Sequence, residues 1–197
     1  MSAENFWSQL LEKYPGLPAD LKPFQVKDHF IWWYDAFHSQ EDAVQLVRSG
    51  SSVVLAIPTG QGKTVPLFVA SLGTGKTGML ILPLLNLEGQ METDLTSLGI
   101  TFVNMTTSSA DELREALEST PPPEIILTNV EGVGDKSKRD VLRRSPVTIG
   151  HIAWDEAMVR KGPVAQFFAI FFNCFPKKIS LFSHSIGYGW CWGVGRL

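Results

Sequence analysis

The stretch Ala56-Ile57-Pro58-Thr59-Gly60-Gln61-Gly62-Lys63-Thr64 connects two apolar segments of different character. Residues 51–56 are rich in β-branched side chains and typical of a buried strand, whereas residues 65–70 can continue as a buried helix with Pro66 in its first turn. Glycines in such a strand-to-helix loop let backbone N–H groups approach phosphate oxygens, which the positive end of the helix dipole also attracts. We therefore interpret the stretch as a phosphate-binding loop.

The loop offers specific groups to a nucleotide. Lys63 would reach the β- and γ-phosphates, and the Thr64 hydroxyl would hold Mg²⁺. The strict phosphate-loop pattern begins with Gly, where this chain has Ile57, but the order strand, glycine loop and helix is the one that phosphate binding requires. The candidate nucleotide-binding residues of this loop are Pro58, Thr59, Gly60, Gln61, Gly62, Lys63 and Thr64.

A second glycine-rich stretch, Gly73-Thr74-Gly75-Lys76-Thr77, also ends in Lys and Thr. The residues that follow it, 78–83, form a short apolar run typical of a buried parallel strand. No helix N-terminus is then offered to a phosphate. We predict that this second stretch is a turn between a helix and a strand.

The composition is that of a globular domain. The chain has 197 residues, of which 44% are hydrophobic and 19% charged, and its formal net charge is −3. This length accommodates one substantial α/β domain. With a pI near 5.8 the chain has no global basic field, so any nucleic-acid contact must come from a local patch.

Two features of the sequence bear on the compartment. Cys174 and Cys191 have no metal-ligand spacing, which fits a reducing environment. The N-terminus lacks the basic and apolar regions of a signal peptide, and no apolar run approaches the roughly 18 residues of a membrane span. We expect a cytosolic or nuclear protein without a membrane partner.

Hydrophobic periodicity predicts alternating strands and helices. Residues 1–20 end in loop chemistry at Pro15-Gly16-Leu17-Pro18, and two helices are expected between Leu21 and Arg48. Beyond them, strands are expected at 52–57, 78–83, 100–104, 124–128 and 148–154, and helices at 63–72, 87–98, 110–118 and 136–144. This alternation predicts an α/β fold, a parallel sheet with helices on both faces.

Asp155 and Glu156 follow the strand expected at 148–154. A nucleotide site needs one acid that holds Mg²⁺ through water and another that orients the attacking water, both at the end of a neighbouring strand. Ligands of parallel sheets lie at the carboxyl ends of the strands. Adjacent acids such as Asp155 and Glu156 can divide metal holding from water activation at this edge.

At this point the chain resembles the superfamily 2 helicases, and most closely the RecQ-like DNA helicases. Residues 58–64 are similar to their motif I, and Asp155-Glu156-Ala157-Met158 to their Asp-Glu-Ala-His box. Leu21-Lys22-Pro23-Phe24-Gln25 is similar to the upstream motif whose glutamine recognises adenine. The order and approximate spacing of the motifs match from about residue 17 to 158.

Two further stretches carry the resemblance. Leu82-Pro83-Leu84-Leu85-Asn86-Leu87, followed by Gln90-Met91, is similar to motif Ia, which lines the path of the single strand. Leu127-Thr128-Asn129-Val130-Glu131 resembles a short Thr-Pro-Glu motif after a later strand. Residues 179–185 are a candidate for the strand and Ser-Ala-Thr-like motif III, with His184 intruding.

The resemblance implies a P-loop RecA-like ATP-binding lobe over residues 17–186, after an N-terminal extension at 1–16 and before an irregular tail at 187–197. It implies ATP and Mg²⁺ as cofactors, adenine recognition by Gln25, and catalytic roles for Lys63, Asp155 and Glu156. Asp155 would hold Mg²⁺ together with Thr64, and Glu156 would orient the attacking water. Single-stranded or partly duplex DNA would be the partner. The complete enzyme would couple ATP hydrolysis to 3′–5′ unwinding, and the resemblance favours the nucleus.

The chain also departs from the family. Met158 replaces a histidine that helps to couple nucleotide state to nucleic-acid binding, and Lys22 stands where arginine is usual. The sequence ends at Leu197, where a helicase would continue into a second lobe that contributes an arginine to the transition state. We therefore expect the chain alone to bind nucleotide weakly and to hydrolyse it poorly.

Two other functions stay open. One is a non-catalytic nucleotide- or nucleic-acid-binding fragment of a truncated helicase, which Met158 favours. The other is a different phosphate-loop protein such as a kinase, although a kinase does not need the motif around Gln25.

Several conspicuous residues have simpler interpretations. The basic residues between 136 and 144 could contact phosphates, but a solvated helix face is the commoner explanation. Trp32-Trp33-Tyr34 could stack on bases, although their helical spacing favours core packing. The four histidines have no ligand spacing, so we assign them no metal.

Overall fold

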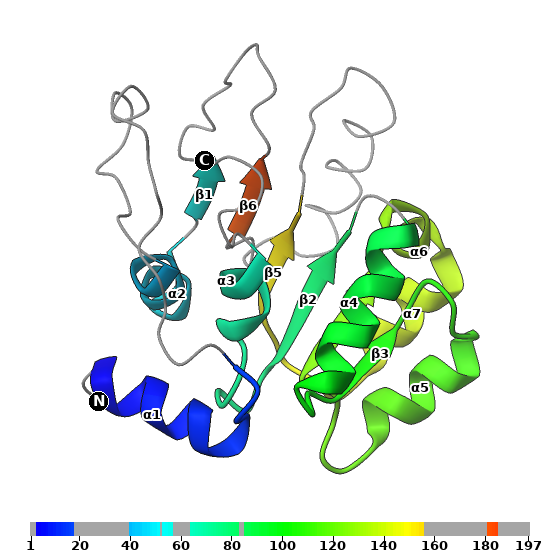
Figure 1. Cartoon of the computed structure of the whole chain (residues 1–197). Coiled ribbons are helices and arrows are strands. Elements are labelled where there is room, and N and C mark those ends of the chain that lie inside the picture. The colour runs from blue at the N-terminus through cyan, green and yellow to red at the C-terminus, as the bar shows by residue number, and fades with distance from the viewer. Residues whose placement is uncertain are drawn as a thin grey trace.

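The computed structural model describes residues 3–17, 40–51, 53–56, 64–82, 85–155 and 181–184. They form one parallel sheet whose strand order is β1-β6-β5-β2-β4-β3, covered by helices (Figure 1). The strands are β1 Val53–Ala56, β2 Thr77–Ile81, β3 Phe102–Asn104, β4 Ile125–Thr128, β5 Ile149–Trp154 and β6 Leu181–His184. The helices are α1 Ala3–Lys13, α2 Gln40–Arg48, α3 Thr64–Val69, α4 Leu85–Ser97, α5 Ala110–Glu118, α6 Val130–Gly134 and α7 Lys136–Arg144.

Alternating residues of the strands build a core on each face of the sheet, because successive side chains of a strand point to opposite faces. On β2, Leu80 packs with residues of α1, α2, α3 and α4. Met79 and Ile81 pack instead with α5, α6 and α7 on the other face. All five residues of β2 are buried, as expected of a strand covered on both sides. The predicted α/β class with helices on both faces is confirmed.

The expected elements lie close to the observed ones, with three exceptions. Helix α3 ends at Val69 rather than at 72, because the chain enters a turn that runs to Lys76. In this turn Gly73 and Gly75 both have φ of 68°. The second glycine-rich stretch is therefore the predicted helix-to-strand turn. It lies at the amino end of β2, the opposite edge of the sheet from the carboxyl end of β1.

Helix α1 is the second exception, since residues 1–20 carry no predicted helix. Leu10, Tyr14 and Leu17 of this segment belong to the core that contains α2 and α3. The Tyr14 hydroxyl also donates to the Glu124 carboxylate just before β4. Burial, followed by this hydrogen bond, raises the pKa of Tyr14 to about 12.

The third exception is α6, a five-residue helix that hydrophobic periodicity does not predict. It begins after β4, where Asn129 caps it by accepting a hydrogen bond from the Gly132 N–H at 2.8 Å. Of the two helices expected between residues 21 and 48, the second is α2, whereas the first lies outside the described residues. None of the helices in the described part of the chain is long and apolar enough to cross a membrane.

Strand β6 lies between β1 and β5 in the sheet. It confirms a strand within residues 179–185. It also corrects one expectation, because the strand that precedes Asp155 was expected beside the phosphate-loop strand. One strand separates the two.

Candidate functional site

The carboxyl ends of the parallel strands meet at one edge of the sheet, the upper edge in Figure 1. β1 ends there at Ala56, and α3 begins eight positions later at Thr64. Asp155 follows β5 directly at the same edge. Of the predicted site residues, Gln25, Pro58, Thr59, Gly60, Gln61, Gly62, Lys63 and Glu156 lie outside the described residues.

The strand register fixes the level of Asp155 relative to β1. Trp154 pairs with Phe182 of β6, and Leu55 pairs with Ser183. Asp155, one residue beyond Trp154, therefore lies level with Leu55 near the end of β1. Two strand spacings separate the axes of β5 and β1, which is roughly 10 Å. Strand β6 lies between the two strand ends, so a ligand that reaches both of them must lie beyond the edge of the sheet.

Helix α3 presents an N-terminus without negative charge. Its first turn contains no acidic residue, while Pro66, Leu67, Phe68 and Val69 are buried and Thr64 is half-buried. Helix α5 differs, because Asp111 and Glu112 lie in its first turn. Acidic groups near a helix N-terminus compete with phosphate for its N–H groups and its dipole. Of these two helices, α3 is the one suited to an anion.

Asp155 is held by the sheet. Its backbone N–H donates to the carbonyl oxygen of Ile81 in β2 at 3.0 Å, and the residue is half-buried. The Asp155 carboxylate and the Thr64 hydroxyl both supply oxygen donors, the kind that Mg²⁺ prefers. The chemistry of the described donors therefore fits the predicted cation.

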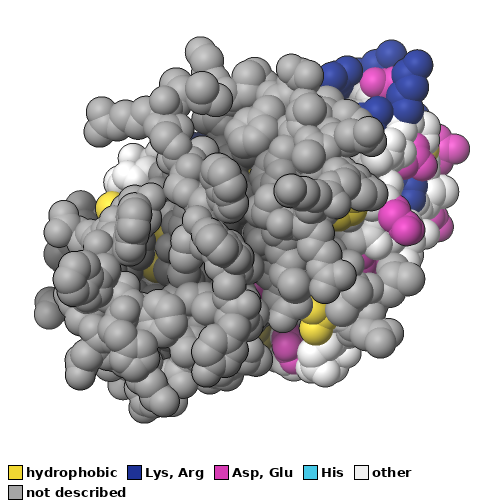
Figure 2. All heavy atoms as spheres, turned by 90° about the horizontal axis from the view of Figure 1, so that it is seen from above, with side chains coloured by type: hydrophobic (Ala, Val, Ile, Leu, Met, Phe, Trp, Pro, Cys, Tyr) yellow, Lys and Arg dark blue, Asp and Glu magenta, His cyan; other side chains and the backbone are white. Residues whose placement is uncertain are grey.

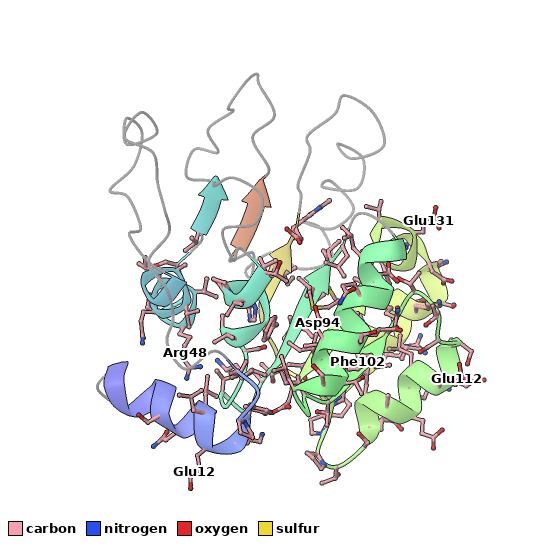
Figure 3. The ribbon with its side chains drawn as sticks, in the orientation of Figure 1. Glu12, Arg48, Asp94, Phe102, Glu112 and Glu131 are labelled. Atoms are coloured by element: carbon pink, nitrogen blue, oxygen red, sulfur yellow. The ribbon has the colours of Figure 1, made fainter. Side chains whose placement is uncertain are left out.

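The segments that resemble motif Ia and the Thr-Pro-Glu motif lie side by side at the same edge. The Leu82 N–H, after β2, donates to the Thr128 carbonyl oxygen at the end of β4 at 2.8 Å. Leu82 and Thr128 are buried, whereas Glu131 on α6 is exposed (Figure 3). Pro83 and Leu84 lie outside the described residues.

A buried polar network that the sequence motifs do not indicate joins α4, the turn after β3 and the start of α6. Glu88 of α4 is 2% exposed, and its carboxylate accepts hydrogen bonds from the Asn104 amide and the Thr106 hydroxyl, both at 3.2 Å. The Asn104 amide also donates to Glu92 at 2.6 Å. Burial raises the pKa of Glu88, and the hydrogen bonds from Asn104 and Thr106 oppose that shift. One signal was available: Glu88 shares the buried stripe of α4 with Met91 and Leu95.

The basic residues of α7 divide into two groups. The Lys138 ammonium donates to the carbonyls of Met105 and Thr106, both at 2.8 Å, and Arg139 donates to those of Val133 and Gly134. These two cations satisfy backbone oxygens of neighbouring turns. Lys136, Arg143 and Arg144 are exposed, although Arg143 lies 3.8 Å from Asp140. Figure 2, which looks down on the carboxyl edge, shows basic side chains gathered at one corner with an acidic one among them.

The other residues singled out in the sequence contribute no described site. His151 is 3% exposed, and its Nε2 lies 2.9 Å from the Leu67 carbonyl oxygen. A cavity of about 50 Å³ beside it, lined by Arg48, Thr74 and Lys76, lies at the amino edge of the sheet. Among the residues that the structure describes, no three or more His, Cys, Asp or Glu side chains come together where they could hold a metal ion. Trp32, Trp33 and Tyr34 lie outside them.

Comparisons with known proteins agree with this architecture. The model of the DEAD/DEAH box helicase family matches residues 37–160. Two solved structures, of the DUF1998 helicase MrfA bound to DNA and AMPPNP and of the same helicase bound to DNA, each superpose with a TM-score of 0.54 at 14% identity. Each covers 90% of this chain, which spans 30% and 29% of the length of those chains. No relative was found among curated proteins. At this identity the two structures support the fold alone.

Proposed function

This chain belongs to the DEAD/DEAH box helicase family, and we propose that it is the first RecA-like, ATP-binding lobe of a RecQ-like DNA helicase. The complete enzyme would couple ATP hydrolysis to 3′–5′ unwinding of DNA in the nucleus. The observation that carries the proposal is the arrangement of the carboxyl edge. There Asp155 and the end of β1, the strand that precedes the expected phosphate loop, lie on either side of β6, with Asp155 level with Leu55.

We assign the following roles. Lys63 binds the β- and γ-phosphates, the backbone of residues 58–63 surrounds them, and Gln25 selects adenine. Thr64 and Asp155 would hold Mg²⁺, whose charge neutralises the negative charge that develops on the phosphates. Glu156 orients the attacking water and takes up its proton. MrfA was crystallised with DNA and AMPPNP, which agrees with a nucleotide and a DNA strand as ligands of this fold.

Nucleotide binding by the chain, with and without Lys63, tests the proposal. We expect the wild-type chain to bind a fluorescent ATP analogue in the presence of Mg²⁺, and Lys63→Ala to weaken the binding by at least tenfold. Lys76→Ala is the matched control, because Lys76 ends the other glycine-rich stretch at the opposite edge and should leave binding unchanged. Equal affinity of wild type and Lys63→Ala would refute the site.

A hydrolysis measurement separates the helicase lobe from its alternative. DNA-stimulated release of phosphate that Glu156→Gln abolishes would support an ATPase lobe. ATP binding that requires Lys63 but gives no turnover, with or without DNA, would instead favour a non-catalytic nucleotide-binding fragment.

A further inference from the structure

The turn after β3 is held from three sides. The Asn104 side-chain oxygen accepts the N–H groups of Thr106 and Thr107 at 2.8 and 3.4 Å. From α7, Lys138 donates to two carbonyls of the turn. From α4, Glu88 accepts the Thr106 hydroxyl, and that hydroxyl in turn accepts the Asn129 N–H at 3.1 Å.

Glu88 thus connects two segments that are remote in sequence. Through Asn104 and Thr106 it orients the turn at 105–108, and through Thr106 it orients Asn129 at the start of α6. Both segments lie at the carboxyl edge beside the motif Ia-like and Thr-Pro-Glu-like stretches. Thr107 is exposed there, and its N–H is already bonded to the Asn104 side chain.

Burying a carboxylate in this place is costly unless hydrogen bonds compensate for the lost hydration. Leu or Met would fill a stripe that already contains Met91 and Leu95 without that cost. An acid on the stripe is therefore explained better by what it orients than by packing.

We propose that Glu88 is a positioning residue, which holds the turn at 105–108 and the start of α6 in the geometry that contacts the phosphodiester backbone of single-stranded DNA. This inference rests on the proposed function for the identity of the ligand. Glu88 itself touches no DNA. Its effect passes through the hydrogen bonds of Asn104 and Thr106.

A donor–acceptor exchange tests the role. In Glu88→Gln only one acceptor oxygen remains, so the NH₂ of the new amide faces either the NH₂ of Asn104 or the Thr106 hydroxyl, both of which now donate to Glu88. In Asn104→Asp a carboxylate faces the carboxylates of Glu88 and Glu92. The double variant Glu88→Gln with Asn104→Asp restores a donor opposite an acceptor and still lets residue 104 accept the N–H groups of the turn. Glu92 is less buried than Glu88 and can turn toward solvent. A merely space-filling role for Glu88 would show no such rescue.

The full chain is assayed with fluorescein-labelled oligo(dT). We expect Glu88→Gln to weaken DNA binding about tenfold. The double variant should bind DNA at least threefold more tightly than Glu88→Gln. The affinity for the ATP analogue should stay within twofold of wild type. Glu115→Gln, an exposed carboxylate on α5, should match wild type. DNA binding by Glu88→Gln equal to wild type, or a double variant no better than the single one, would overturn the inference.

Amide hydrogen exchange provides a second readout that needs no DNA. The N–H groups of Thr106 and Asn129 should exchange at least tenfold faster in Glu88→Gln and recover in the double variant, while those of β2 stay protected. Should Glu88→Gln fail to fold, Thr106→Val breaks the same connection with little change in shape and is expected to expose the Asn129 N–H. Unchanged exchange of the Thr106 and Asn129 N–H groups would overturn the inference about Glu88 and leave the proposed function standing. A wild-type chain that binds ATP but no DNA would overturn the proposed partner, and with it the DNA-contact role.

Discussion

The hydroxyl of Tyr14, directly after α1, donates a hydrogen bond to Glu124, 110 positions later in the chain, at the entrance of β4. The Lys13 ammonium contacts the same carboxylate oxygen at 2.7 Å, and the other oxygen faces Thr101. The N-terminal helix is thereby bonded to the amino edge of the sheet as well as packed against the core.

Tyr14→Phe should lower the free energy of unfolding by about 1–2 kcal/mol, because it removes the donor while the partly buried carboxylate remains. Urea denaturation measures the change. Lys13→Met provides the comparison: the Lys13 side chain is 60% exposed, so its loss should cost less than about 1 kcal/mol. If Tyr14→Phe were as stable as wild type, the hydrogen bond would make no net contribution.

Alkaline pH should weaken the same connection. The pKa of Tyr14 is raised to about 12, above its value of about 10 in an unfolded chain, so the folded state prefers the neutral phenol. This contribution is complete below pH 10 and is lost as the pH rises from 10 through 12. Unfolding measured at pH 9 to 11.5 should show the stability of wild type approaching that of Tyr14→Phe. Parallel curves for the two proteins would contradict the assignment.

The two glycines of α6 should respond differently to alanine. A Cβ on Gly132 would lie 2.5 Å from Thr128 Oγ1 and 3.1 Å from Thr106 Oγ1, whereas a Cβ on Gly134 meets nothing within 4 Å. We expect Gly132→Ala to destabilise the protein by about 1–3 kcal/mol, and Gly134→Ala to be neutral or slightly stabilising. Thermal melts of both variants check this, and similar melting temperatures would show that α6 shifts at little cost.

Mild acid should destabilise the core around His151. Burial lowers the pKa of His151 from its usual 6.5, and the nearby charge of Arg48 lowers it further, although the hydrogen bond to Leu67 opposes the shift. The folded state therefore favours neutral imidazole, and stability present above pH 6.5 is lost as the pH falls below it. Urea midpoints between pH 7.5 and 5 should fall more steeply for wild type than for His151→Gln, whose amide does not titrate. Equal slopes would mean that His151 takes up a proton without cost.

Gln25 should determine which base is bound. If its amide recognises adenine, Gln25→Ala will reduce the preference for ATP over GTP while leaving the requirement for Lys63 in place. Competition of both nucleotides against the fluorescent analogue measures this. An unaltered preference would refute the adenine role.

The strands were predictable because local sequence determines them. The apolar runs that become β2, β4 and β5 are bounded by glycine, proline or acidic residues, and covered strands need little else. Helices α1 and α6 were missed for different reasons. In α1 the proline-rich end at residues 15–18 outweighed a helical spacing of apolar residues, and in α6 two glycines lower the propensity that capping by Asn129 restores.

The site was predictable only in part. Asp155 follows β5 at the carboxyl edge and Thr64 begins α3, as the sequence pattern predicts, and the roles of all the motif residues stay predictions. The place of Glu88 on the apolar stripe of α4 signals a buried acid, but its partners could not be predicted, because Glu88, Asn104 and Asn129 come together only when α4, β3 and β4 pack. The place of β6 likewise depends on pairing between remote segments, which periodicity does not encode.

The position of β6 also has a consequence for the order in which the protein matures on the ribosome. In the described part of the sheet, β1 pairs with β6 alone, and β6 comes last in sequence. Strands β2 to β5 can pair while synthesis continues, but β1, made early, waits for a partner synthesised after all of them. The nascent chain therefore exposes β1 as an unpaired strand during translation. At this stage a chaperone would protect that strand from aggregation.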